Sequence, residues 1–167
     1  RQTVCTKPPA LETELARADA IETSPKTCHL HNVLGELQSQ FSDRNLSLHY
    51  PGLSNYELAI APEVLAMALY NLLENSIQHG AQQVEFRATR HDDKVVLQVH
   101  DNGQGISVAN QDKIFTPFFT TKRSTGGTGL GLAITVSLLK AYQGSVENLP
   151  TDQGALFIMT INLAQVG

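Results

Sequence analysis

The strongest constraint on the fold is a long glycine-rich segment, residues 101–131, which lacks the periodicity of a helix or a strand. Structureless segments of this length are uncommon in compact domains and are usually functional. The segment follows an apolar run and leads into a helical pattern, so its two ends should be held by regular structure. The sequence therefore predicts one long ligand-binding loop.

Regular patterns on both sides of this loop predict a scaffold. Apolar residues at helical spacing indicate helices over residues 31–41, 61–79 and 128–142. Alternating or compact apolar runs indicate strands over residues 46–50, 57–60, 84–89, 95–100, 145–149 and 155–162. Because helices and strands are mixed without regular βαβ alternation and hairpins dominate, we expect an α+β sandwich.

Residues 1–28 carry the weakest pattern. Pro8-Pro9 and Ser24-Pro25 interrupt regular structure at either end of the stretch. Between them, apolar residues from Leu11 to Ile21 recur at helical spacing, which predicts a short helix. We therefore divide the chain into a leading segment, residues 1–28, and a globular domain, residues 29–167.

Composition narrows the class of protein. The 167 residues are 41% hydrophobic, which suits one domain with a continuous core. A formal net charge of -4, with 6% aromatic residues and no Trp, argues against a nucleic-acid partner. Two cysteines are too few for a disulfide framework, which favours a reducing compartment. No stretch approaches the ~20 apolar residues that span a bilayer, and a start at Arg1 suggests a piece of a longer protein.

The longest predicted helix has a polar stripe. Asn71, Asn75 and Gln78 share one face, and Glu74 and His79 flank them. A solvated surface is the simplest interpretation of such a stripe. The alternative is that the amide oxygens complete the coordination of Mg²⁺, which prefers hard oxygen ligands.

The loop itself contains three distinctive runs. Asp101-Asn102-Gly103-Gln104-Gly105 follows a strand, where a carboxylate can accept a hydrogen bond from an exocyclic amine, although a plain turn would use the same residues. Phe115-Thr116-Pro117-Phe118-Phe119 places three aromatic residues in a polar loop, as core or as a movable lid. Gly126-Gly127-Thr128-Gly129-Leu130-Gly131 leads into a helix, where exposed backbone N–H groups can bind an anion.

Taken together, these runs resemble the N, G1, F and G2 boxes of two-component sensor histidine kinases. The matching runs are Asn71-Leu72-Leu73-Glu74-Asn75, Asp101-Asn102-Gly103-Gln104-Gly105, Phe115-Thr116-Pro117-Phe118-Phe119 and Gly127-Thr128-Gly129-Leu130-Gly131-Leu132. Their order and spacing match as well, and the resemblance covers about residues 30–163. It implies the Bergerat ATP-binding sandwich shared with gyrase B subunits, MutL and heat-shock chaperones. This fold has a mixed, largely antiparallel sheet, helices on one face and a long ATP lid.

The resemblance also implies roles for individual residues. Asn75 corresponds to a ligand of Mg²⁺, and Asn71 to a residue that supports the metal and the phosphates. Asp101 corresponds to the residue that accepts a hydrogen bond from the adenine amino group, and Lys122 to a catalytic cation facing the phosphates. The full set expected to contact nucleotide is Asn71, Asn75, His79, Asp101, Gly103, Gly105, Ile106, Phe115, Phe118, Lys122, Arg123, Gly127, Thr128, Gly129, Leu130 and Gly131.

The chain departs from the family pattern at two positions. Many of these kinases have Lys and Tyr where this chain has Gln78 and His79, which removes an ammonium contact to phosphate. His79 is expected either to replace the Tyr as a ligand contact or to cap the helix. Glu74 is a candidate base, since gyrase-like relatives use a Glu in this box to activate water.

The family assignment implies a kinase that lacks its own acceptor. None of the six histidines has the sequence context of an acceptor on a dimerisation hairpin, so the acceptor should lie upstream or on another protein. Residues 1–28 then form a linker or the remnant of that hairpin. The expected full-length protein is a homodimer that phosphorylates a response regulator. This domain would be cytoplasmic, with an anchor in the inner membrane as an option for the whole protein. The alternatives are a Bergerat-type ATPase and a degenerate kinase that only senses nucleotide.

Overall fold

A computed structural model describes residues 26–119 and 130–165 of the chain. The short helix expected between residues 11 and 21 and the end of the glycine-rich loop lie outside these residues. The helices are α2 (Leu30–Phe41), the 3₁₀ turn η1 (Ser42–Arg44), α3 (Pro62–Gln78), α4 (Val108–Gln111) and α5 (Gly131–Ala141). The strands are β1 (Cys28–His29), β2 (Ser47–His49), β3 (Glu57–Leu58), β4 (Gln83–His91), β5 (Lys94–Asp101), β6 (Ser145–Leu149) and β7 (Leu156–Asn162).

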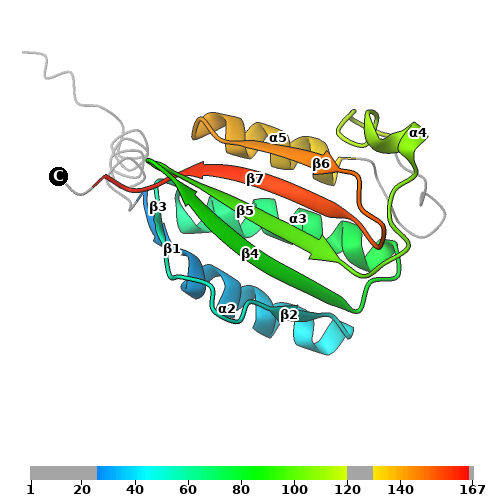
Figure 1. Ribbon diagram of the computed structural model, residues 1–167, viewed down its shortest axis with the longest axis horizontal. Helices are drawn as coiled ribbons and strands as arrows, with labels where there is room; N and C mark the ends of the chain where they lie inside the picture. Colours follow the sequence, from blue (N-terminus) through cyan, green and yellow to red (C-terminus); the bar gives the residue numbers. More distant parts are fainter. Residues whose placement is uncertain (1–25, 120–129, 166–167) are drawn as a thin grey trace, which may run out of the picture.

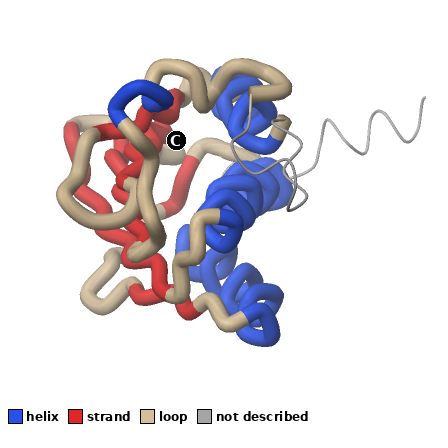
Figure 2. The backbone as a smooth tube through the Cα atoms, turned by 90° about the vertical axis from the view of Figure 1, so that its right-hand side faces the viewer, coloured by secondary structure: helices blue, strands red, loops and turns tan. Residues whose placement is uncertain are grey.

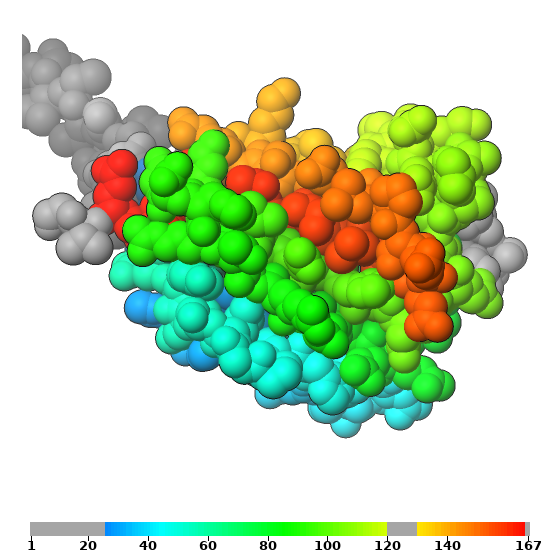
Figure 3. All heavy atoms as spheres, viewed as in Figure 1, coloured from blue at the N-terminus to red at the C-terminus, as the bar shows by residue number. Residues whose placement is uncertain are grey.

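The two-layer α+β architecture is confirmed. Five strands form one sheet in the order β2-β4-β5-β7-β6, in which the β2–β4 pair is parallel and the other pairs are antiparallel. Helices α2, α3 and α5 lie against one face of this sheet, as Figures 1 and 2 show. The opposite face is seen in Figure 3, where β4, β5, β7 and β6 cross the surface. Strands β1 and β3 form a separate antiparallel pair.

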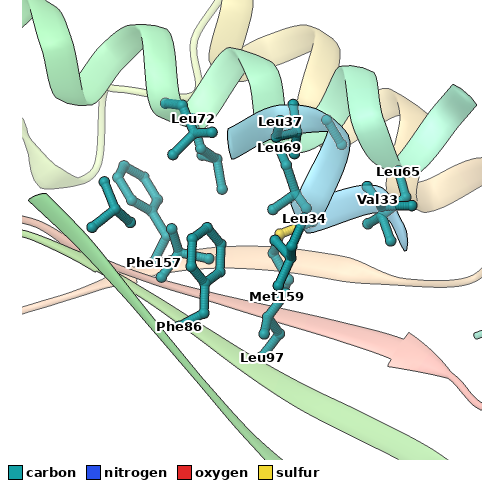
Figure 4. Close-up of a cluster of buried hydrophobic side chains, with 14 of the residues drawn as sticks. Val33, Leu34, Leu37, Leu65, Leu69, Leu72, Phe86, Leu97, Phe157 and Met159 are labelled. Atoms are coloured by element: carbon teal, nitrogen blue, oxygen red, sulfur yellow. The ribbon is translucent and has the colours of Figure 1, made fainter. Parts of the chain in front are cut away.

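The core fills the space between the sheet and the helices. Figure 4 shows leucines of α2 and α3 pointing at the inward side chains of the strands, among them Phe86, Leu97, Phe157 and Met159. Leu97 and its neighbours Val95 and Val99 on β5 are buried, and the residues between them are not, as a strand with one covered face requires. The period-two pattern of the sequence therefore predicted both the strand and its inward face.

Sequence patterns missed three short elements, β1, η1 and α4, and misjudged several boundaries, among them the end of β3 and the start of α5 at Gly131. Strand β1 covers Cys28 and His29, on either side of the division drawn after residue 28. Helix α4 lies inside the segment expected to be a structureless loop. Strand β3 ends at Leu58 rather than residue 60, since its partner β1 has only two residues, and the N–H of Ala59 donates to the carbonyl of Asn162 at 2.8 Å. Elements this short contain too few residues for a period to be recognised.

Two polar contacts fix α3 between its neighbouring helices. On one side, the buried hydroxyl of Thr135 on α5 lies 3.1 Å from the carbonyl of Ala68, to which it can donate. On the other side, Arg44 of η1 makes a bidentate ion pair with Glu74, and its second nitrogen lies 3.1 Å from Oε2. The Arg44 guanidinium also lies 5.2 Å from the ring centroid of Phe41 at the end of α2. The helix layer is thus held laterally as well as against the sheet.

The Arg44–Glu74 pair predicts a pH-dependent contribution to stability. Its hydrogen bonds hold the pKa of Glu74 below its usual value of 4.5. A carboxyl whose pKa is lower in the folded state stabilises the fold above 4.5, and this contribution disappears as the pH falls through the lowered value. We expect Glu74→Gln to lower the free energy of unfolding by less than about 1 kcal/mol at neutral pH. The difference from wild type should shrink to nothing in acid, measured by urea unfolding across pH.

A matched control is Glu85→Gln on β4, which removes an ion pair to the far more exposed Arg87. This change should cost less than Glu74→Gln at neutral pH. A Glu74→Gln penalty of the same size at neutral and acid pH would contradict an electrostatic origin.

Candidate functional site

Asp101, the last residue of β5, is the centre of the candidate site. Its side chain is buried, with only 3% of its surface exposed. The Oδ1 atom accepts hydrogen bonds from the backbone N–H groups of Gly103 and Ala155, both at 3.0 Å, and Oδ2 accepts one from the Ser76 hydroxyl at 2.8 Å. A carboxylate oxygen can accept about two hydrogen bonds. Among the described residues, Oδ2 therefore keeps room for one more donor.

Glycines let three segments meet around this carboxylate. A Cβ at Gly103 would lie 2.7 Å from the carbonyl oxygen of His79, at the end of α3. Gly105 has a φ of +82°, and a Cβ there would lie 2.6 Å from the carbonyl oxygen of Gly154. Gly154 itself comes so close to Asp101 that a Cβ would meet the Asp101 carbonyl oxygen at 1.7 Å. The loop after β5 and the β6–β7 turn can approach this closely only because side chains are absent.

Asn102 anchors the start of the loop. Its side-chain oxygen accepts hydrogen bonds from the backbone N–H groups of Gln82 at 2.8 Å and Gln83 at 3.0 Å. The N–H of Gln104 then donates to the carbonyl of His79 at 2.8 Å. These bonds tie the Asp-Asn-Gly-Gln-Gly run to the turn after α3, so its backbone is held in one place before any ligand binds.

Asn71 of α3 lies beside the start of α5, and Asn75 follows one helical turn later on the same face of α3. The position of a Cβ at Gly131, the first residue of α5, is 3.6 Å from Oδ1 of Asn71. The side-chain nitrogens of Asn71 and Asn75 are buried and have no hydrogen-bond partner within the described residues. A buried donor left unpaired costs about 1–3 kcal/mol, so such groups in folded proteins usually have a partner. Both amide nitrogens therefore lack the partner that a buried donor usually has, as far as the described residues go.

This amide pair fits a magnesium–nucleotide complex. The carbonyl oxygen of an Asn side chain is the kind of hard ligand that Mg²⁺ takes, and the –NH₂ end suits a phosphate oxygen. Asn75 adjoins Ser76, whose hydroxyl reaches Asp101. A carboxylate suited to an exocyclic amine and a pair of amides suited to phosphate and metal are thus connected by one turn of helix.

Glu74 does not join this pair. Its carboxylate turns toward Arg44 on the α2 side of the helix, whereas Asn71 lies beside α5. The ion pair lowers the pKa of Glu74. A carboxylate held in an ion pair is a poor general base, since its proton affinity is reduced.

The phenylalanine run is divided between core and surface. Phe115 packs edge-on against Phe157 of the core, with ring centroids 6.2 Å apart, and Phe119 is half-buried against the same core. Phe118 has a φ of +69° and 64% of its surface is exposed. Ile106, also expected at the site, is half-buried against the core. The run thus attaches the loop to the domain through its first and last rings.

The remaining site predictions fall at the end of the loop. Lys122, Arg123, Gly127, Thr128 and Gly129 lie outside the described residues. Leu130 is the N-cap of α5, and Gly131 begins the helix next to Asn71. His79 ends α3, and its N–H bonds to the carbonyls of Asn75 and Ser76.

Three residues of the site lie outside the sequence motifs. Ser76 was hidden within the helical pattern, and Gly154 and Ala155 looked like an ordinary turn and strand start. Only the glycine at the turn hinted at a close approach, and its partner lies far away in the chain.

Comparison with known proteins identifies a matching family. A family described as histidine kinase-, DNA gyrase B-, and HSP90-like ATPase matches residues 61–165. The alginate biosynthesis sensor protein KinB of Pseudomonas aeruginosa is 39% identical over 95 residues, which cover 54% of this chain and 16% of that protein. The signal transduction histidine-protein kinase AtoS of Escherichia coli is 37% identical over 110 residues, covering 63% and 18%. The chain thus spans less than a fifth of these relatives.

Solved structures match a larger share of the chain. The catalytic domain of histidine kinase ThkA superposes with a TM-score of 0.71 at 25% identity, covering 82% of this chain and 94% of that one. The mycobacterial sensor histidine kinase MprB superposes with the same TM-score at 18% identity, covering 84% and 98%, and this likeness concerns the fold alone.

No helix within residues 26–119 and 130–165 has the length and apolar character to cross a membrane. With its fold, its four sequence runs and the family match in agreement, the chain belongs to the family of histidine kinase-, DNA gyrase B- and HSP90-like ATPases.

Proposed function

We propose that this chain is the ATP-binding catalytic domain of a two-component sensor histidine kinase. The observation that carries the proposal is the pairing of one buried carboxylate, which has room for a further donor, with two buried Asn side-chain nitrogens that lack partners among the described residues. The relatives support the same function, since KinB is named a sensor protein and AtoS a histidine-protein kinase.

Each group has a defined task in binding. Asp101 would accept a hydrogen bond from the adenine amino group, and the backbone at Gly103 and Gly105 would lie against the base. Asn75 and Asn71 would hold Mg²⁺ and phosphate oxygens, and the bound ion would neutralise triphosphate charge. Lys122 and Arg123, with the backbone of residues 127–131, would contact the phosphates. The site would thus bind and orient the nucleotide and neutralise its triphosphate charge, which is most of what phosphoryl transfer requires.

The transfer itself needs a group from outside this chain. The γ-phosphorus would form a bond to an imidazole nitrogen of the acceptor as its bond to the ADP oxygen breaks. The acceptor would belong to a dimerisation domain of the same full-length protein, which would act as a homodimer and pass the phosphoryl group to a response regulator. This domain would lie in the cytoplasm, and an anchor in the inner membrane stays an option for the full-length protein.

The state of Glu74 disfavours the rival function, hydrolysis of ATP by an activated water. Such a reaction needs a free base beside the phosphates. The Glu74 carboxylate is instead held by Arg44 on the α2 side, and the pKa of Glu74 is lowered.

Replacing Asp101 tests recognition of the base. Asp101→Asn removes the charge that makes the hydrogen bond to an adenine amine strong, and such bonds contribute about 1.5–3 kcal/mol. We expect the affinity for a non-hydrolysable ATP analogue with Mg²⁺ to fall by roughly 10- to 150-fold in calorimetric titrations. Asp43→Asn in the exposed turn η1 is the matched control and should bind as wild type does. Wild-type affinity in Asp101→Asn would remove this residue from the site, and a wild type that binds nothing would sink the proposed function.

Replacing Asn75 tests the metal site. We expect Asn75→Ala to lose most of the gain in ATP-analogue affinity that Mg²⁺ gives the wild type over EDTA, because an oxygen ligand is removed. Asn32→Ala, an exposed position on α2, should keep the full gain. The measurement is the ratio of the two dissociation constants, with and without metal, for each variant. An unchanged ratio in Asn75→Ala would show that the metal is held elsewhere.

A further inference from the structure

Ser76 is a buried polar residue that no motif includes. It lies in the last turns of α3, immediately after Asn75, with 1% of its surface exposed. Its hydroxyl is 2.8 Å from Oδ2 of Asp101 and 3.1 Å from the carbonyl oxygen of Leu72, one helical turn earlier. A hydroxyl has one proton to donate. The carboxylate is both closer and charged, so it is the stronger acceptor.

The bond fixes the one oxygen of Asp101 that has spare capacity. The Oδ1 atom is already occupied by the N–H groups of Gly103 and Ala155, which leaves Oδ2 as the oxygen facing a ligand. Rotation of the carboxylate would exchange the two oxygens, and Ser76 opposes this from the helix side. The hydroxyl uses one lone pair of Oδ2, so the direction of the other lone pair is set.

We propose that Ser76 is a positioning residue for base recognition, acting through Asp101. The inference rests on the proposed function, because it concerns how that site selects an adenine. In this role the hydroxyl aims the free lone pair of Oδ2 at the exocyclic amine. Because the hydroxyl already restricts the carboxylate before ligand binds, less conformational entropy is lost on binding.

A purely structural role for Ser76 has a different signature. A helical Ser that bonds only to the carbonyl four residues earlier affects the stability of the helix. Replacing such a Ser would change the affinity for all nucleotides by the same factor, or for none of them. A positioning role changes the affinity only for ligands that offer the amine.

The test compares two triphosphates, the ATP analogue and its counterpart on unsubstituted purine, which lacks the exocyclic amine. In Ser76→Ala we expect the affinity for the amine-bearing nucleotide to fall about 10-fold. The affinity for the purine nucleotide should change less than about 2-fold, which is within the weak effects expected away from the interaction. Ser76→Cys keeps the side-chain shape but donates weakly, so it should show the same selective loss.

Two controls separate the possible causes. Ser39→Ala removes a hydroxyl that bonds to the carbonyl of Gly35 four residues earlier on α2, at 3.3 Å, without any carboxylate. It should leave both affinities unchanged. In an Asp101→Asn background, Ser76→Ala should add less than about 2-fold, because residues that act through one contact are not additive.

The outcomes are distinct. Equal losses for both nucleotides in Ser76→Ala and Ser76→Cys, or no loss for the amine-bearing one, would overturn the positioning role while leaving the proposed function in place. A full additional loss in the Asp101→Asn background would also overturn it. A wild type that binds neither nucleotide would defeat the proposed function, and this inference with it.

Discussion

One buried carboxylate organises the functional end of this fold. Burying a charge is costly unless it is fully hydrogen-bonded. Asp101 takes bonds from α3 through Ser76, from the following loop through Gly103 and from the β6–β7 turn through Ala155. Because these donors come from three separate segments, satisfying the charge also fixes where the segments meet. The same bonds leave Oδ2 with room for one further donor, so the stability of this end and the proposed binding of a ligand depend on one set of contacts.

Helix α3 has three sides in different surroundings, facing the sheet, α2 and α5. Its leucines bury themselves against the sheet, as Figure 4 shows. The side toward α2 carries Glu74, which is neutralised by Arg44. The side toward α5 carries Asn71, and Asn75 follows one helical turn later; the side-chain nitrogens of both lack partners in the described part of the chain. A single helix thereby separates a charge that is already paired from two amide nitrogens that have no partner within the described residues, so the acidic and amide positions of one motif have different surroundings.

The sequence predicted the regular elements well, since hydrophobic period depends on local spacing. It placed α3 and the β4–β5 hairpin close to their observed bounds, and it picked out Asp101 and the two asparagines. The misses involve partners distant in the chain. Arg44 and Glu74 are 30 residues apart, and Asp101 and Ala155 are 54 apart, so no local pattern could join them. Ser76 was missed for another reason, because a small residue within a helix looks like core until its neighbour at the end of β5, Asp101, is known.

The central claim is that Asp101 and the asparagines of α3 form a nucleotide site. A direct test is to follow the NMR signals of amide groups in this site as nucleotide is added. In a ¹⁵N-resolved NMR titration with Mg²⁺ and a non-hydrolysable ATP analogue, the backbone amides of Gly103 and Ala155 and the side-chain amides of Asn71 and Asn75 should shift together and saturate. The amide of Gln98, exposed on β5, should not move. Saturable shifts elsewhere with these signals unmoved, or no shifts at all, would contradict the account.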